Sequence, residues 1–219
     1  MAPLCSLKDV ISLSLLLPWN LVVIYLISRK GYELMSRIKG RVAGIYLARK
    51  LIHILSGGLT VLVLPLAFDG PFLPSISAIG LALVTYLPHK RGRLMTWFQM
   101  KDNISEVYFA LMWGLLILVA WYIDIRLAIL PISFMAFGDG ITGIVRVVLY
   151  SHRNKAWIGN LAMGLVCVPL GYAYLGPIGA LAGAMASLIE HLEFIDDNLS
   201  IPLTSLSILL ITKSLMPSI

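Results

Sequence analysis

Long apolar runs, each of the length needed to cross a lipid bilayer, recur along this chain of 219 residues. A membrane-spanning helix needs about 20 mainly apolar residues. Only 13% of the residues are charged, whereas soluble domains carry roughly 25%, so the composition excludes a soluble globular enzyme. We therefore predict an all-α polytopic membrane protein with about eight transmembrane helices, near Val10–Ser28, Leu51–Phe68, Phe72–Leu87, Ile104–Ile123, Arg126–Tyr150, Ala156–Leu175, Pro177–Leu192 and Ile201–Met216.

The sequence predicts three regions. Residues 1–28 are expected to form an N-terminal transmembrane anchor that stays uncleaved, because Arg29 and Lys30 follow it directly and no small-residue cleavage pattern is present. Residues 29–50 carry apolar side chains at spacings of three and four with basic residues between them, which is typical of a basic interfacial amphipathic helix. Such a helix serves either as a topology anchor or as a gate for a lipid substrate. Residues 51–219 are expected to form a membrane-embedded catalytic domain.

The distribution of basic residues predicts the orientation. If eight spans alternate across the membrane, one face receives all 17 Lys and Arg residues except Lys8, Arg126 and Lys213. Cytoplasmic loops of membrane proteins carry the excess of Lys and Arg. We therefore expect a multi-pass integral membrane protein with its active site on the cytoplasmic face and both termini outside.

Five short polar clusters interrupt or border the apolar runs on this same face. Ionisable residues within spans are costly and mark functional sites. Asp139 is the strongest candidate, because it lies inside a long apolar run, where a carboxylate needs a cation or a water-filled cavity. Structural interpretations remain open for the others: Arg49 can snorkel to the interface, and Glu106 can pair with Lys101 or Lys155. The clusters are Arg49–His53, Asp102–Glu106, Gly138–Gly143, Lys155–Asn160 and Asp196–Asn198.

The residue types in these clusters favour phosphoryl transfer. Mg²⁺ takes oxygen ligands and shares them with substrate phosphates, and cationic side chains neutralise the transferred group. The surrounding membrane suggests a long apolar alcohol or lipid as the second substrate. Neither a P-loop nor the protein-kinase motif set is present. The candidate metal ligands are Asp139, Asp196 and Asp197, with Asn103 or Asn198 as further oxygen donors, and the candidate phosphate-binding cations are Arg49, Lys50 and Lys155.

At these residues the chain resembles the family of CTP-dependent polyprenol, dolichol and phytol kinases, which are related to the phosphatidate cytidylyltransferases. The similar pieces occur in the same order between residues 49 and 203. They are Arg49-Lys50-Leu51-Ile52-His53 with Gly57, Glu106 before Gly114, Gly138-Asp139 with Gly143, Lys155-Ala156-Trp157-Ile158-Gly159, and Glu190 followed by Asp197-Asn198-Leu199-Ser200-Ile201-Pro202-Leu203.

The resemblance implies that these pieces form a site for CTP and Mg²⁺. The chain departs from the family at two positions, because Ala156 replaces a Ser or Thr after the lysine and Asn160 replaces a Ser after the glycine. These replacements remove hydroxyl groups that would contact phosphate. The residues expected to bind the nucleotide are Arg49, Lys50, His53, Lys155, Gly159, Asn160 and Asn198.

The expected function is transfer of the γ-phosphate of CTP to the hydroxyl of a long-chain isoprenoid alcohol of the phytol, geranylgeraniol or dolichol type, which yields CDP and the polyprenyl monophosphate. Lys155 would neutralise developing charge, and Glu106 or Asp139 would accept the alcohol proton. Membrane lipid is an expected partner and nucleic acid is not. Two alternatives stay open: a cytidylyltransferase that forms a CDP-lipid, and a small proton- or ion-coupled transporter.

Overall fold

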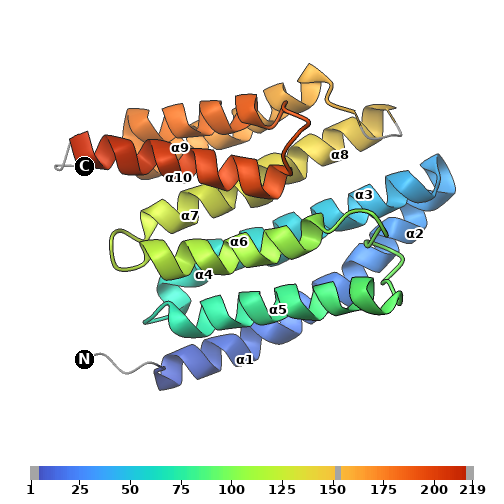
Figure 1. Cartoon of the computed structure of the whole chain (residues 1–219), viewed down its shortest axis with the longest axis horizontal. Coiled ribbons are helices and arrows are strands. Elements are labelled where there is room, and N and C mark those ends of the chain that lie inside the picture. The colour runs from blue at the N-terminus through green and yellow to red at the C-terminus, as the bar shows by residue number, and fades with distance from the viewer. Residues whose placement is uncertain (1–4, 151–153, 216–219) are drawn as a thin grey trace.

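A computed structural model describes residues 5–150 and 154–215 of the chain. Within these ranges every regular element is helical, as predicted, and the one bridge joins Met100 to Asn103. Three short π-helical segments, at Val23–Ile27, His53–Gly58 and Phe134–Gly138, connect helices that continue one another. The helices are α1 (Leu7–Val22), α2 (Ser28–Lys39), α3 (Arg41–Ile52), α4 (Leu59–Ala67), α5 (Phe72–Arg91), α6 (Ser105–Ala120), α7 (Arg126–Ser133), α8 (Asp139–Tyr150), α9 (Trp157–Ile189) and α10 (Asp197–Leu215), arranged as in Figure 1.

The described helices are those of a multi-pass membrane protein. Six continuous helices are long and apolar enough to cross a bilayer, and α6, at 16 residues, is a shorter apolar helix. Helix α9 contains two of the expected spans, because it leaves helical geometry at Leu175 and Gly176. Its two arms then pack so closely at Gly171 and Gly179 that neither position has room for a Cβ atom. The number of eight spans stays a prediction.

The basic segment 29–50 forms a helical hairpin, which corrects the expected single helix. Gly40 has a φ of 89°, a conformation that glycine adopts without the steric cost of a side chain, and it separates α2 from α3. The two helices pack tightly, since a Cβ on Gly44 would overlap the carbonyl oxygen of Tyr32. Helix α2 continues α1 and α3 continues into α4, so the hairpin extends from the bundle (Figure 1). Its position at the membrane interface stays a prediction.

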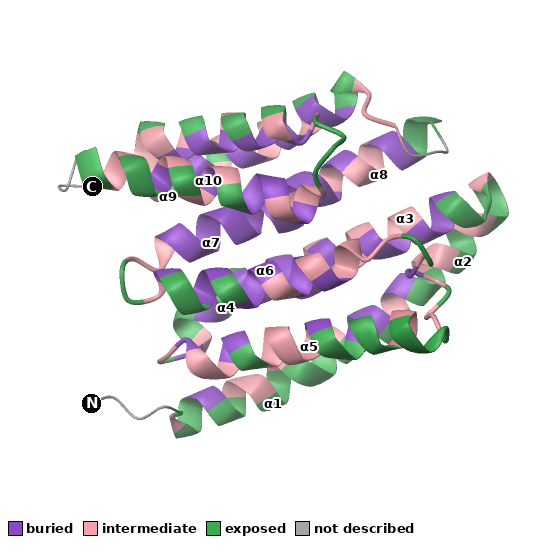
Figure 2. Ribbon diagram, viewed as in Figure 1, coloured by how far each residue is buried: buried purple, intermediate pink, exposed green. Residues whose placement is uncertain are grey.

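The most buried part of the bundle is α7 and the start of α8. Leu127, Ile129, Leu130 and Ile132 are almost entirely inaccessible. Figure 2 shows α7 as buried along nearly its whole length, whereas α1 is mainly exposed. The run from α7 to α8 is therefore an interior helix, and the carboxylate of Asp139 that it carries lies inside the protein.

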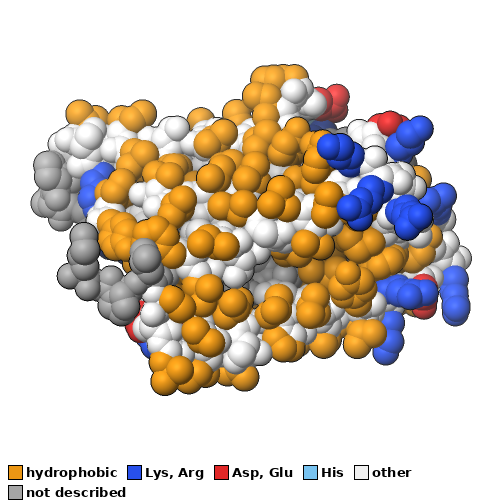
Figure 3. Space-filling view, turned by 60° about the horizontal axis from the view of Figure 1, so that its bottom comes forward, with side chains coloured by type: hydrophobic (Ala, Val, Ile, Leu, Met, Phe, Trp, Pro, Cys, Tyr) orange, Lys and Arg blue, Asp and Glu red, His pale blue; other side chains and the backbone are white. Residues whose placement is uncertain are grey.

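Charge is separated between the two ends of the molecule. Lys and Arg side chains gather at the end that holds the α2–α3 hairpin (Figure 3), and α1 begins and α10 ends at the opposite end (Figure 1). At that opposite end, burial alone would raise the pKa of Asp124, but hydrogen bonds from Arg126 and Lys213 lower it to about 2. The membrane side that each end faces stays a prediction. Arg153 and Met216, counted above on the basic face and in the last span, lie outside the described residues.

Candidate active site

Asp139 lies at the start of α8, directly after a π-helical segment, and is 3% exposed. Lys50 of α3 donates a hydrogen bond from Nζ to Asp139 Oδ2 at 2.6 Å. His53 Nδ1 lies 3.3 Å from the same oxygen, without the alignment of a hydrogen bond. The helices approach closely because Gly143 leaves room for the Lys50 side chain, which a Cβ there would overlap. A carboxylate inside an apolar run was expected to need a cation or a water-filled cavity, and the structure shows that Lys50 is that cation.

Three carboxylates gather beside this ion pair. One oxygen each of Asp139, Glu190 and Asp197 lies within 4.8 Å of the other two, an arrangement able to hold a metal ion. Lys155 Nζ donates to Glu190 Oε1 at 2.9 Å and to Asp197 Oδ1 at 2.8 Å. Oxygen donors of this kind suit Mg²⁺. The structure thus brings together Asp139, Lys155 and Asp197 from the sequence prediction and adds Glu190.

Asp196 is not a member of this carboxylate trio. Its Oδ1 accepts a hydrogen bond from the backbone N–H of Asn198 at 2.9 Å, and its Oδ2 accepts one from the Ser105 hydroxyl. These contacts place Asp196 just before α10, where a short acidic side chain satisfies free backbone donors. Of the expected metal ligands Asp139, Asp196 and Asp197, the structure thus groups the first and the last with Glu190, whereas Asp196 lines the neighbouring polar cavity. Which of them bind a metal ion stays a prediction.

Arg146 forms an ion pair with Glu190. Its sequence context had not marked it as a site residue. Its guanidinium binds both oxygens of Glu190, at 2.6 and 2.9 Å, and Asn160 Oδ1 at 2.9 Å. Gly159 makes space for this guanidinium, which a Cβ would overlap. Gly159 and Asn160, expected to bind nucleotide, therefore hold the Arg146–Glu190 pair. Arg146 lies two helical turns after Asp139, and this spacing was the signal available in the sequence.

Arg49 and Glu106 form a second buried group. Arg49 donates to the Phe98 carbonyl at 2.6 Å, to Asn103 Oδ1 at 2.5 Å and to Glu106 Oε2 at 3.1 Å. The other Glu106 oxygen lies 2.6 Å from His89 Nε2. Glu106 thus pairs with Arg49 and His89, and not with Lys101 or Lys155. His89 and Gln99, which also donates to Glu106 at 3.0 Å, are contacts that the sequence did not indicate.

A polar cavity of about 50 Å³ opens beside the carboxylates. The buried Asn198 Oδ1 borders it and accepts no hydrogen bond from the part of the chain that the structure describes. A buried acceptor of this kind is normally satisfied, so it is available to a ligand. Four of the seven residues expected to bind nucleotide line this cavity, namely Arg49, Lys50, His53 and Asn198.

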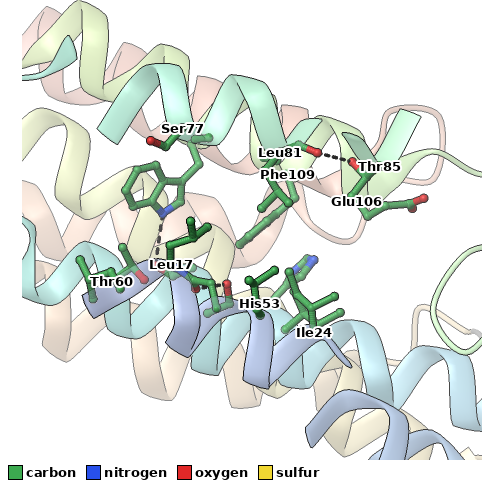
Figure 4. A pocket seen from close by; sticks show the side chains of 18 of the residues that line it. Leu17, Ile24, His53, Thr60, Ser77, Leu81, Thr85, Glu106 and Phe109 are labelled. Atoms are coloured by element: carbon green, nitrogen blue, oxygen red, sulfur yellow. Dashed lines mark hydrogen bonds between the residues drawn. The ribbon is translucent and has the colours of Figure 1, made fainter. Parts of the chain in front are cut away.

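A larger apolar cavity of about 140 Å³ lies on the other side of Arg49 and His53. Its walls come from α1, α5, α6 and the segment from His53 to Thr60 (Figure 4). The His53 ring stacks on Phe109, with ring centroids 4.0 Å apart. Figure 4 shows Glu106 and His53 toward one end of the cavity and Thr60 and Ser77 toward the other. Arg49 and His53 line both cavities, so a charged site and an apolar chamber share a wall.

Comparison with known proteins finds homologues in plants. A protein of Triticum aestivum named probable phytol kinase, chloroplastic, is 24% identical over 196 residues, and its namesake in Zea mays is 25% identical over 196 residues. Each alignment covers 73% of this chain. Probable phytol kinase 1 of Oryza sativa subsp. japonica is 26% identical over 223 residues and covers 83% of the chain.

The chain spans 65% of the wheat protein, 64% of the maize protein and 70% of the rice protein. No family model matches it, and no solved structure is significantly similar. The alignments cover most of this all-helical chain. Its polar site has the residue types that phosphoryl transfer needs. Over about three quarters of its length the chain is thus similar to plant proteins named probable phytol kinase.

Proposed function

We propose that this protein is an integral membrane kinase that transfers the γ-phosphate of CTP to the hydroxyl of an isoprenoid alcohol. The observation that carries the proposal is the wall formed by Arg49 and His53, which line the polar and the apolar cavity at once. A kinase of this kind must bring a highly charged donor and an apolar acceptor to one point. The relatives named phytol kinase support the same class of acceptor.

The polar cavity is proposed to receive the terminal phosphates of the nucleotide. Asp139, Glu190 and Asp197 would hold Mg²⁺, because their oxygens lie within 4.8 Å of one another. Bound there, Mg²⁺ would neutralise charge on the phosphate oxygens. Lys50 and Lys155, which now pair with these carboxylates, supply ammonium groups to the same phosphates. The choice of CTP rests on the resemblance of the motifs, and ATP is the competing donor in the test below.

The acceptor hydroxyl is proposed to lie at the shared wall. Asp139 lies 3.3 Å from His53, on the polar side of this wall, so Asp139 would accept a hydrogen bond from the hydroxyl and orient it toward the phosphate. Glu106 has a different role, because Arg49, His89 and Gln99 already use its oxygens. We assign Glu106 to positioning Arg49.

The orientation is part of the proposal. The basic end of the molecule, beside the polar cavity, would face the cytoplasm because loops rich in Lys and Arg are retained there. CTP would then enter from the cytoplasm, and the alcohol would enter from the bilayer. Cysteine accessibility to a membrane-impermeant reagent tests this, with a single cysteine introduced at exposed Lys30 or Arg91 in a variant that lacks Cys5 and Cys167.

The deciding experiment uses the detergent-solubilised protein with CTP or ATP labelled at the γ-phosphate and a panel of prenyl alcohols. We expect label in an organic-extractable product with CTP, release of CDP, and loss of both in the Asp139→Asn variant. Pyrophosphate release from a phosphorylated lipid would identify a cytidylyltransferase instead. Full activity of the Asp139→Asn variant would overturn the proposal, as would solute flux across sealed vesicles without nucleotide turnover.

A further inference from the structure

The apolar cavity has two unlike ends. One end reaches the polar groups of the shared wall. At the other end, two hydrogen bonds join the start of α1 to the end of α4 and the residues after it. Ser12 donates to the Ala67 carbonyl at 2.5 Å, and Asp9 Oδ1 accepts from the backbone N–H of Asp69 at 2.7 Å. The cavity is therefore a chamber with a polar mouth at one end and, at the other, the packed ends of α1 and α4. We call this second end, where Leu13, Phe68 and Pro74 line the chamber, the closed end.

The chamber is shorter than a membrane is thick. His53 and Phe68 are separated by 15 residues of nearly continuous helix, which at 1.5 Å per residue corresponds to about 22 Å. The hydrocarbon core of a bilayer is about 30 Å thick. A chain held fully inside the chamber must therefore be limited in length.

The long side of the chamber reaches the outer surface of the bundle between α1 and α5. Leu17 and Leu21 line the chamber although they are 50% and 44% exposed. Within the described part of the chain, the hydrogen bonds of α1 go to the end of α4, to Asp69 and to His53–Gly58, and Ile24 just after α1 accepts one from Trp97. None of these bonds goes to α5. A hydrocarbon chain can thus enter sideways from the bilayer without breaking a hydrogen bond.

The charge at the mouth favours a neutral head group. Arg49 already pairs with Glu106, and Lys50 already pairs with Asp139. Glu106 reaches the chamber while Asp139 borders the polar cavity. The chamber itself thus offers one cation and one carboxylate that neutralise each other, which suits a hydroxyl better than the phosphate of a phospholipid.

We propose that this chamber holds the tail of a single-chain isoprenoid alcohol, and that its closed end sets the longest tail that is bound completely. Ser77 of α5 is the specificity-determining position, because it lines the chamber away from the mouth (Figure 4). A larger side chain there divides the chamber. This inference rests on the proposed function for the identity of the head group, and it adds a limit on the length of the tail.

Photo-crosslinking tests the chamber without using catalysis. The probe is geranylgeraniol with a diazirine on its last isoprene unit, bound to the full-length protein in detergent. We expect label at Leu13, Phe68 or Pro74, and loss of that label in Ser77→Phe. The matched control is Ile76→Phe, since Ile76 is the neighbouring residue, is 63% exposed and does not line the chamber. Label confined to exposed residues, or unchanged in Ser77→Phe, overturns the inference.

Kinase assays in parallel separate this inference from the proposed function. In Ser77→Phe we expect the ratio of kcat/KM for geraniol to that for geranylgeraniol to rise by about tenfold, with no change in Ile76→Phe. Phe68→Leu, which enlarges the closed end, shifts the preference toward longer alcohols and gives a second measure if Ser77→Phe is unstable. Correct labelling without phosphorylation of any alcohol contradicts the function alone. Phosphorylation with an unchanged length preference and unchanged labelling contradicts the chamber alone.

Discussion

Lys50 and Asp139 lie 89 residues apart in the sequence and form an ion pair of 2.6 Å inside the helical bundle. The Lys50 side chain is 12% exposed and the Asp139 side chain is 4% exposed. Removing one partner from a buried pair leaves an uncompensated charge, whereas removing both often costs little. This asymmetry allows stability and activity to be tested separately at one site.

Lys50→Met is expected to destabilise the protein by roughly 3 to 5 kcal/mol and to abolish activity, because it leaves the Asp139 carboxylate without its cation. The double variant Lys50→Met/Asp139→Leu should recover most of the stability and none of the activity. Thermal unfolding in detergent and the radiolabel assay measure the two effects. Lys30→Met, at an exposed position of α2, is the control. Equal instability of the single and double variants would argue against a buried pair.

Glu190→Gln is expected to raise the Mg²⁺ concentration for half-maximal activity by about tenfold or more. The reason is that Glu190 belongs to the carboxylate trio with Asp139 and Asp197. Asp196→Asn should leave this concentration nearly unchanged, because Asp196 binds Asn198 and Ser105 instead. Mg²⁺ titrations of the two variants provide the comparison. A larger effect from Asp196→Asn would restore the metal set that the sequence suggested.

Gly143→Ala is expected to lower activity by about tenfold or more, since small displacements of catalytic groups are costly. The added Cβ overlaps Cγ, Cδ and Cε of Lys50, so it displaces the ammonium group while the flexible side chain absorbs much of the strain. Gly80→Ala in α5 is the matched control, because nothing lies within 4 Å of its Cβ. Kinetic constants of both variants measure the effect on activity, and their melting temperatures measure the effect on stability. Normal activity of Gly143→Ala would show that the Lys50 position is not critical.

Asp124→Asn is expected to destabilise the opposite end of the molecule in a pH-dependent way. Although burial opposes it, hydrogen bonds from Arg126 and Lys213 lower the pKa of Asp124 from 3.8 to about 2. A lowered carboxylate pKa contributes stability that is fully present above the unfolded pKa and is lost as the pH falls toward the folded pKa. After allowance for solvent screening the contribution is about 1 kcal/mol at neutral pH.

Melting temperatures of the wild type and of Asp124→Asn should therefore differ at pH 7 and converge as the pH falls from 4 to 2. Activity per folded molecule should be equal, because Asp124 binds Lys213 near the end of α10, whereas Asp197 of the carboxylate trio begins that helix. A difference that persists at pH 2 would mean that the variant acts through packing.

The sequence predicted the site best where lipid made a polar residue conspicuous. Asp139 stood out because a carboxylate inside an apolar run has few structural explanations. Lys155 and Asp197 joined it because their clusters were predicted on the same face and their residue types suit phosphate and Mg²⁺. Arg146 and Glu190 were overlooked as a pair because each lies near the end of an apolar run, where charged residues are ordinary. The segment 29–50 was expected to be one helix because periodicity continues through Gly40, whose φ of 89° breaks it.

The sequence by itself determined that this protein is a helical membrane protein with its polar residues concentrated near one end. The reason is that the bilayer acts as a solvent on every residue, so hydropathy and the need for internal backbone hydrogen bonds are readable locally. Only the tertiary structure decided that Glu190 joins Arg146 and the carboxylate trio, that Glu106 pairs with Arg49, and that Lys50 pairs with Asp139. Those contacts join residues 44 to 89 positions apart, and they depend on which helices pack together, which local patterns do not encode.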